Sequence, residues 1–259
     1  MTGVQTCALP ICIGNRVLPD WMDIVDDPTQ TERQGKPLAG FYPYDIEGVK
    51  PRPVSLVEKG TLKNFLWTRL PGKGWKESNG HARLGGGYGW RSAAISNLFI
   101  NASQTEPLNG LKAKLIQMCN DRSKPYGFLV RRLDYPFASG GGELQSLLAS
   151  ARTGGSARPV SPPTLIYRVY PDGREELVRG LRFRGVSIRS LRDILAASAE
   201  TAQFDFVNNG APLALLGGGG LLAPASVIAP GLLFDEIEFE RSQDQLQKPP
   251  IVPPPNVKS

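Results

Sequence analysis

Glycine and proline place the tightest limit on what this chain can fold into. They account for 29 and 23 of the 259 residues, together about a fifth. Glycine weakens a helix interior by about 1 kcal/mol relative to alanine, and proline removes a backbone donor, so long helices are disfavoured. Hydrophobic residues at 41% and charged residues at 21% are near the globular average, which excludes overall disorder. The chain is therefore predicted to consist mainly of strands and turns.

Two stretches alternate apolar and polar residues around a glycine-containing turn, the pattern of a β-hairpin. The first turn is Lys59-Gly60, and the second is Pro171-Asp172-Gly173, in which each residue type favours a turn. The flanking strands are predicted at Pro53–Glu58 and Thr61–Arg69, and at Leu165–Tyr170 and Glu175–Arg179.

Hydrophobic periodicity predicts the other elements. Helices are expected at Glu106–Arg122, at Leu144–Ala151, and at Leu191–Ala199 after a capping Ser190. Strands are expected at Trp21–Val25, Ala93–Ala102, Tyr126–Leu133, Leu181–Ile188 and Leu232–Glu240. The remaining stretches are read as a long loop at Pro71–Gly89, extended chain at Pro159–Pro163 and Phe204–Phe206, and irregular or strand structure at Ala211–Leu233. These elements predict an α+β fold, mainly antiparallel strands and hairpins with a few helices.

The first twelve residues, MTGVQTCALPIC, differ from the rest of the chain. They carry no charge and lack the basic start of a signal peptide. The string resembles a translated sequencing adapter, so residues 1–12 are expected to be a non-native scar and the natural protein to continue upstream of Ile13. Of the three cysteines, Cys7 and Cys12 lie in this string, which leaves Cys119 and no disulfide framework. A reducing, cytoplasmic location is therefore expected.

Charge and hydropathy argue against two classes of partner. The net charge is +6, but the basic residues are spread thinly with acids between them, whereas a phosphate-binding face needs a denser stripe. Nucleic-acid binding is therefore the weakest of the functions considered. No apolar run reaches the 18–20 residues, roughly, of a membrane span, and Ala211–Leu233 is broken by four consecutive glycines. No membrane partner is expected.

His81 is the only histidine in the chain, and it lies in the segment Ser78–Arg83, which reads SNGHAR. Asn79 and His81 are candidate substrate-binding residues in a cleft. The alternative is a solvent-exposed loop histidine. The run Gly217, Gly218, Gly219 and Gly220 is a second candidate, because a peptide backbone can lie close to a glycine backbone; plain loop flexibility is the alternative. The run lacks the lysine and helix of a phosphate loop.

Two groups of acids allow a functional and a structural interpretation. Asp20, Asp23, Asp26 and Asp27 form a potential cation site, but closely spaced acids beside a turn are more often solvated or capping groups. Asp45 and Glu47 form a potential acid–base pair. Because no histidine or metal ligand is adjacent to them in the sequence, a structural role in orienting the neighbouring strand is favoured.

Several blocks, read in order, together resemble the C-terminal domain of the TldD/PmbA family. The most specific are DDP at Asp26, DIEGV at Asp45 and SNGHAR at Ser78. The others are GNRVLPDWMDIV before DDP, SNLFI, KPYG, YRVYPDGREELVRG and APGLLFDEIEFER. The resemblance implies a domain over residues 13–246, truncated at its start and followed by a Pro-rich tail at 247–259.

Members of that family are zinc metallopeptidases that act on peptides, also described as modulators of DNA gyrase. The resemblance implies two zinc-binding histidines in a His-Glu-x-x-x-His motif and a cysteine as third ligand, with the glutamate as general base. This sequence lacks the motif, and no cysteine lies in the Gly-rich segment Asn208–Ala223. The chain is therefore expected to be an inactive fragment of a cytoplasmic zinc metallopeptidase whose catalytic helix lies upstream, working as a homodimer or heterodimer. A non-catalytic partner subunit is the alternative, and a basic nucleic-acid-binding module is the third.

Overall fold

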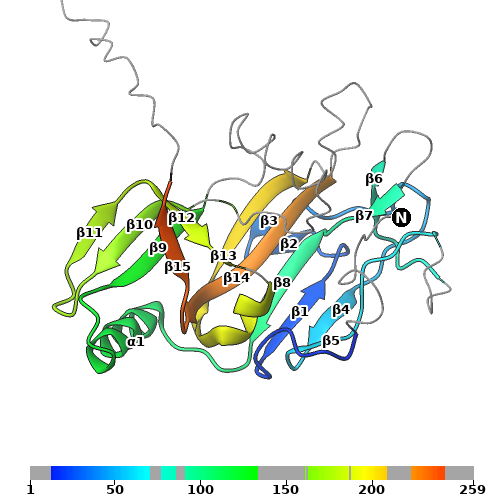
Figure 1. Ribbon diagram of the computed structural model, residues 1–259. Helices are drawn as coiled ribbons and strands as arrows, with labels where there is room; N and C mark the ends of the chain where they lie inside the picture. The colour runs from blue at the N-terminus through cyan, green and yellow to red at the C-terminus, as the bar shows by residue number, and fades with distance from the viewer. Residues whose placement is uncertain are drawn as a thin grey trace, which may run out of the picture.

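The computed structural model describes residues 13–70, 77–85, 91–133, 161, 163–186, 188–208 and 223–242. Its largest element is a six-stranded sheet with the strand order β13-β14-β8-β1-β4-β5 (Figure 1). The strands are β1 (Met22–Asp26), β4 (Val54–Glu58), β5 (Thr61–Leu62), β8 (Asn97–Ala102), β13 (Ile194–Asn208) and β14 (Ala223–Phe234). Neighbouring strands are antiparallel, apart from the parallel pair β14 and β8.

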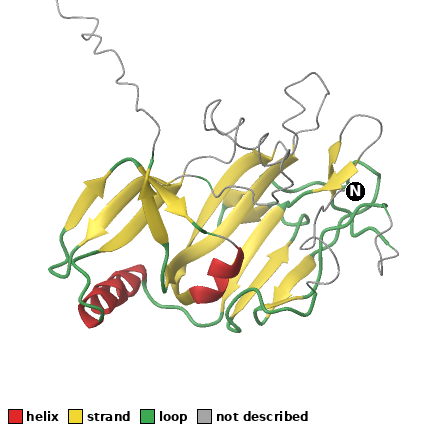
Figure 2. Ribbon diagram, in the orientation of Figure 1, coloured by secondary structure: helices red, strands yellow, loops and turns green. Residues whose placement is uncertain are grey.

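Smaller sheets and one α-helix complete the described fold. Helix α1 (Leu108–Asp121) and a 3₁₀ turn (Ile188–Asp193) are the red elements of Figure 2. The other strands pair as β9 (Gly127–Leu133) with β10 (Pro163–Val169) and β11 (Glu175–Val178), β12 (Leu181–Arg184) with β15 (Glu238–Arg241), β2 (Glu32–Arg33) with β3 (Lys36–Pro37), and β6 (Ala82–Gly85) with β7 (Arg91–Ala93). The predicted α+β class with mainly antiparallel strands is confirmed.

The elements with the clearest local signals are those that the sequence predicted best. Hairpin β4–β5 turns at Lys59 and Gly60, which have φ angles of 46° and 71°. A Cβ on Gly60 would lie 2.3 Å from the carbonyl oxygen of Leu18, so only glycine fits. The second strand is shorter than expected and ends at Leu62. Helix α1, strands β1 and β9, and hairpin β10–β11 are also confirmed.

Three expectations are wrong. Leu191–Ala199 is not a helix, because the 3₁₀ turn ends at Asp193 and β13 then runs along β14, with Ala196 opposite Leu233. Strand pairing outweighs the helix preference of the alanines. Leu232–Glu240 is not one strand, since β14 ends at Phe234 and β15 begins at Glu238. Part of the expected loop Pro71–Gly89 is strand β6.

Other strand boundaries shift, and some expectations fall outside the described residues. The stretch 93–102 divides between β7 and β8, and the stretch 181–188 ends as a strand at Arg184. The short helix at Leu144–Ala151 and most of the extended stretch Pro159–Pro163 are not among the described residues, and the same holds for residues 1–12, Gly217–Gly220 and the tail at 247–259.

The two faces of the main sheet bury different apolar clusters. On one face Leu18, Met22, Val57 and Ile194 form a buried cluster that is extended by partly buried side chains such as Ile24 and Ile100. The opposite face buries Phe99 and Ile228 under Leu38. The segment that carries Leu38 is tied to the sheet by a hydrogen bond from Ala39 N to Ser226 Oγ, 2.8 Å long. Both faces of the central strands are therefore covered.

Glu175 joins helix α1 to the three-stranded sheet. Its carboxylate lies 2.7 Å from Lys112 Nζ and 2.8 Å from Arg131 Nη2. The hydrogen bond from Lys112 lowers the pKa of Glu175 below its usual value of 4.5, with Arg131 acting in the same direction. A carboxyl with a lowered folded-state pKa adds stability above its unfolded value, and that stability is lost as the pH falls through the folded value.

Replacing Glu175 by glutamine should therefore flatten the loss of stability on acidification. Urea unfolding between pH 6 and pH 3 measures this, with Glu32→Gln on the exposed strand β2 as the matched control. The variant is expected to lose stability less steeply than the parent chain below about pH 4.5. An identical slope for Glu175→Gln and the parent chain would refute the linkage.

Candidate functional site

Asp26, the last residue of β1, is a fully buried carboxylate. Its Oδ2 accepts a hydrogen bond of 2.9 Å from Ser96 N, and its Oδ1 accepts one from Ser96 Oγ. Both donors belong to Ser96, the residue just before β8, and β8 pairs with β1. A buried charge needs partners that replace water, and Ser96 supplies two of them.

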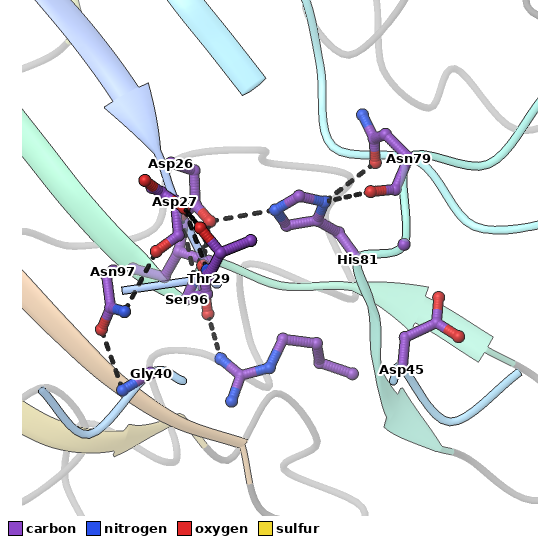
Figure 3. A network of polar contacts seen from close by, with 12 residues as sticks. Asp26, Asp27, Thr29, Gly40, Asp45, Asn79, His81, Ser96 and Asn97 are labelled. Atoms are coloured by element: carbon purple, nitrogen blue, oxygen red, sulfur yellow. Dashed lines mark hydrogen bonds and ion pairs between the residues drawn. The ribbon is translucent and has the colours of Figure 1, made fainter. Parts of the chain in front are cut away.

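His81 is the third partner of Asp26 and is also fully buried (Figure 3). Its Nε2 lies 3.0 Å from Asp26 Oδ1. On the other side of the ring, Nδ1 lies 3.1 Å from the carbonyl oxygen of Asn79 and 3.0 Å from its Oδ1. The Asn79 amide is held in this orientation because Oδ1 also accepts from Trp67 N and Nδ2 donates to Phe65 O.

Both ring nitrogens of His81 therefore face oxygen atoms. Asn79 Oδ1 can only accept, so Nδ1 carries a proton. One proton between Nε2 and Asp26 Oδ1 then completes the set of donors and acceptors, together with the two hydrogen bonds from Ser96. The arrangement is a buried histidine–aspartate pair in which both ring nitrogens are engaged.

This geometry excludes one of the two interpretations of His81. The solvent-exposed loop histidine is wrong, because the side chain is 0% exposed. Asn79 is also buried, at 6%. Their contact with a substrate stays a prediction. What the contacts provide is positioning: His81 ties the segment before β6 to the ends of β1 and β8.

Of the other acids of the first group, Asp27 and Asp23 accept hydrogen bonds from backbone N–H groups. Asp27 Oδ1 accepts from Thr29 N at 2.9 Å and caps the turn after β1. Asp23 Oδ1 accepts from Lys59 N at 2.7 Å, and Asp20 is an exposed partner of Arg16. Within the described ranges no group of three histidine, cysteine, aspartate or glutamate side chains is arranged to hold a metal ion. The capping interpretation of the turn acids is confirmed for Asp27.

Asp45 and Glu47 do not form an acid–base pair. Asp45 Oδ1 accepts from the backbone of Glu47 and Val49, and Oδ2 accepts from Ala82 N at 3.2 Å. Glu47 accepts from Arg69 N. Asp45 therefore holds a turn against the first residue of β6, so the predicted structural role in orienting a neighbouring strand is confirmed.

Tyr42 and Arg83 were not singled out by the sequence, yet they pack beside this network. The Arg83 guanidinium lies 4.6 Å from the centre of the Tyr42 ring and donates to the carbonyl oxygen of Ile95 at 2.5 Å. Burial raises the pKa of Tyr42, and burial also lowers the pKa of Arg83. Tyr42 Oη donates to the carbonyl oxygen of Gly80. Through these contacts, Tyr42 and Ile95 hold the segment Ser78–Arg83 at Gly80 and Arg83.

Ser96, Asn97 and Ser226 are further residues that sequence reasoning missed. All three are 0% exposed. Asn97 Oδ1 accepts from Gly40 N at 2.9 Å, and its Nδ2 donates to Asp27 O at 3.0 Å (Figure 3). The available signal was a polar Ser-Asn pair at the start of an otherwise apolar strand.

The remaining candidates lie elsewhere. Cys119 is a free, buried thiol on α1, and burial raises its pKa. A pocket of about 360 Å³ opens at the far end of β8, beside Trp21, Glu106 and Lys114. Three of the basic residues, Arg131, Arg182 and Arg184, form ion pairs with Glu175, Glu240 and Glu238. These pairs give the nucleic-acid interpretation no support. In the described part of the chain, no helix is long and apolar enough to cross a membrane.

Comparison with known proteins places the chain among peptidase-like sequences. Residues 7–124 match the model of the PmbA/TldA metallopeptidase C-terminal domain. A Metalloprotease PmbA homolog from Haemophilus influenzae is 39% identical over 79 residues, which is 30% of this chain and 16% of the relative. A Metalloprotease from Archaeoglobus fulgidus is 36% identical over 74 residues, 29% of this chain and 16% of the relative.

Two solved structures share the fold. TldE from Thermococcus kodakarensis superposes with a TM-score of 0.53 at 14% identity, over 89% of this chain and 42% of that one. A protein named as a candidate modulator of a DNA gyrase, from Thermotoga maritima, gives a TM-score of 0.55 at 17% identity, over 90% of this chain and 42% of that one. The chain therefore spans less than half the length of the structures it resembles.

Proposed function

We propose that this chain is a member of the PmbA/TldD metallopeptidase family and forms the C-terminal domain of a zinc-dependent peptidase acting on peptides or unfolded segments. The observation that carries the proposal is the family match over residues 7–124, supported by relatives named as metalloproteases. The free thiol of Cys119 is consistent with a cytoplasmic enzyme.

The described residues do not fit a zinc centre. A catalytic zinc needs about three protein ligands, of which imidazole and thiolate are the commonest. Both nitrogens of His81 are engaged by Asp26 and Asn79, so neither has a lone pair directed at a metal. Cys119 lies on α1, apart from His81, and no ligand cluster occurs in the ranges that the structure describes. The proposal therefore places the zinc ligands in another part of the protein.

The role proposed for this domain is to hold the main sheet and the segment Ser78–Arg83 in place. Asp26 joins its own segment to two others: His81 lies 55 residues further along the chain, and Ser96 lies 70 residues further along. Asp45 fixes the first residue of β6, and Tyr42 binds Gly80 O. The segment is thus held from three sides, which is the preorganisation that a peptide-binding wall requires.

A non-catalytic partner subunit is the second candidate. The sequence feature that favours it is the absence of cysteine from the Gly-rich segment 208–223. The family resemblance implies that zinc-binding relatives carry their third ligand in this segment. In this version the domain contributes a wall to the substrate groove of an active relative and binds no metal.

Zinc content separates the alternatives. The 259-residue chain, incubated with excess zinc and desalted, should retain well under 0.1 zinc per chain by plasma mass spectrometry and cleave no unfolded casein. The genomic DNA upstream of the Ile13 codon should encode His-Glu-x-x-x-His, and the protein expressed from the extended frame should carry about one zinc per chain.

The outcomes divide cleanly. An extended protein with the motif and with zinc supports the peptidase. An extended protein without zinc supports the partner subunit and overturns the peptidase proposal. Stoichiometric zinc on the 259-residue chain would contradict the placement of the ligands outside the described residues.

A further inference from the structure

The dipeptide Asn79-Gly80 combines a side-chain amide with a following glycine. In an open chain this combination is reactive, because the backbone nitrogen of the glycine can reach Cγ of the asparagine and no Cβ shields it. The sequence contains two other such dipeptides, at Asn109-Gly110 and at Asn209-Gly210, and the second of these lies outside the described residues. Asn79 is only 6% exposed, whereas Asn109 is exposed at the start of α1.

The reaction open to this pair is deamidation through a cyclic imide. Gly80 N attacks Cγ of Asn79, so an N–Cγ bond forms and the Cγ–Nδ2 bond breaks. Nδ2 leaves as ammonia, together with the proton that Gly80 N gives up. Water then adds to either carbonyl carbon of the ring and opens it to aspartate or isoaspartate. Water is the co-reactant of the sequence, and nothing is oxidised or reduced.

In the folded chain the Asn79 amide is fixed at both of its ends. Its Oδ1 lies 3.0 Å from His81 Nδ1 (Figure 3) and accepts from Trp67 N at 2.8 Å. Its Nδ2 donates to Phe65 O at 2.9 Å. Reaction at Cγ makes this atom tetrahedral and expels Nδ2, so the hydrogen bond to Phe65 must be given up. Because a buried polar group is costly to leave unpaired, the closed network opposes the reaction.

The attacking residue, Gly80, is held as well. Its N–H donates to Ser78 Oγ at 3.0 Å, and its carbonyl oxygen accepts from Tyr42 Oη at 2.7 Å. A Cβ on Gly80 would lie 2.5 Å from Pro51 Cα, so the backbone at this point has little room to shift. Gly80 is also buried, which keeps out the solvent base and the water that the reaction uses.

We propose that Asn79-Gly80 is a site of spontaneous deamidation that the fold keeps unreactive, and that it reacts when the segment Ser78–Arg83 opens. The change is then permanent, since an aspartate at position 79 has no N–H to donate to Phe65 O and places a carboxylate oxygen against that carbonyl. Isoaspartate also lengthens the backbone beside the close contact with Pro51. The modification therefore marks each chain whose segment has opened. It needs neither zinc nor peptidase activity, so it is independent of the proposed function.

Deamidation rates, measured by mass spectrometry of peptides from the 259-residue chain, test the protection by the fold. The chain is incubated at mildly alkaline pH, either folded or in urea, and is digested at acidic pH to stop the reaction. In urea, Asn79 should deamidate much faster than Asn64, which precedes a phenylalanine. In the folded chain, Asn79 should react about 100-fold more slowly than in urea, or slower still, because an opening must precede the reaction.

A single hydroxyl tests whether opening of the segment sets the rate. Tyr42→Phe removes the hydrogen bond to Gly80 O and should speed the deamidation of Asn79 in the folded chain about fivefold, the effect of one hydrogen bond. Asn109 is the internal reference, and its rate should not change, because α1 is not part of the segment. Tyr44→Phe, at a 61% exposed tyrosine, is the matched control and should leave both rates unchanged.

Trypsin cleavage after Arg83 measures whether the product holds the segment open. Arg83 is 7% exposed, so the folded parent chain should be cut there slowly. Asn79→Asp reproduces one product of the reaction and should be cut after Arg83 about tenfold faster, with an unchanged circular dichroism spectrum. Asn109→Asp is the matched control and should be cut at the rate of the parent chain.

Three results would overturn the proposal. Equal rates at Asn79 in the folded chain and in urea would show that the fold gives no protection. A Tyr42→Phe chain in which Asn79 reacts no faster, or in which Asn109 accelerates equally, would separate the reaction from opening of the segment. Cleavage of Asn79→Asp at the rate of the parent chain would show that the segment closes again over the product.

Discussion

Replacing His81 by alanine is expected to lower the free energy of unfolding by about 3–5 kcal/mol. The His81 ring is fully buried against the fully buried Asp26, with Nε2 and Oδ1 3.0 Å apart. Removal of the ring leaves the carboxylate in the interior with only the two hydrogen bonds from Ser96. Urea unfolding at pH 7, followed by tryptophan fluorescence, measures the loss.

Two further variants separate the buried charge from the lost volume. The double variant His81→Ala/Asp26→Asn should be more stable than His81→Ala alone, because the unpaired carboxylate is also removed. Asp20→Ala breaks an exposed pair with Arg16, 4.0 Å long, and should change the stability by under about 0.5 kcal/mol. A loss of less than 1 kcal/mol, roughly, for His81→Ala would show that Asp26 has no need of its partner.

Gly80→Ala should destabilise the chain by about 3 kcal/mol or more. Gly80 has a φ of +78°, a conformation that costs a residue with a Cβ about 1–3 kcal/mol. The added Cβ would also lie 2.5 Å from the Cα of Pro51 and 2.8 Å from the carbonyl oxygen of Lys50, both backbone atoms. The segment must move, and Asn79 and His81 move with it. Thermal unfolding of the purified variant measures the effect.

Gly110→Ala is the matched control. Gly110 lies inside α1, and its added Cβ would meet Glu106 Oε2 at 3.4 Å, an ordinary contact. Alanine is the better helix former, so this variant should be more stable than the parent chain by up to about 1 kcal/mol. A Gly80→Ala protein as stable as the parent chain would contradict the close packing of SNGHAR against Pro51.

Elements with a complete local signal could be predicted from the sequence. The β4–β5 turn is indicated by the adjacent residues Lys59 and Gly60, and α1 follows from apolar residues at helical spacing, with Leu111 and Cys119 buried as the pattern requires. The match to the PmbA/TldA C-terminal domain could also be expected from the sequence, because DDP, DIEGV and SNGHAR are short contiguous blocks. Each of these signals lies within a few neighbouring residues.

Strand β13 could not be predicted in the same way. Its alanines at 196, 197 and 199 look helical by propensity, but Ala196 and Ala197 pair with β14, and Glu106 bonds Ala197 and Ala199 on the other edge, so the stretch is extended. That partner begins at Ala223, fifteen residues after β13 ends at Asn208. The information that decides the conformation of β13 is therefore not in its own residues.

Within the candidate site, the residue types were visible but their partners were not. Asp26, Asp45, Asn79 and His81 were all singled out by type and motif, yet whether His81 is exposed or buried depends on Asp26, 55 residues away. Ser96, Asn97 and Ser226 were missed because their hydrogen-bond partners, Asp26, Gly40 and Asp205, lie in other parts of the sequence.

By itself, therefore, the sequence determined the strand-rich class, the hairpin turns, helix α1 and the resemblance to the PmbA/TldD family, because glycine and proline restrict the backbone locally and motifs are contiguous. Only the tertiary structure decided that β13 is a strand paired with β14, and that the single histidine is a buried partner of Asp26. Burial and pairing are properties of residues brought together from distant parts of the chain, and their energies exceed the local preferences.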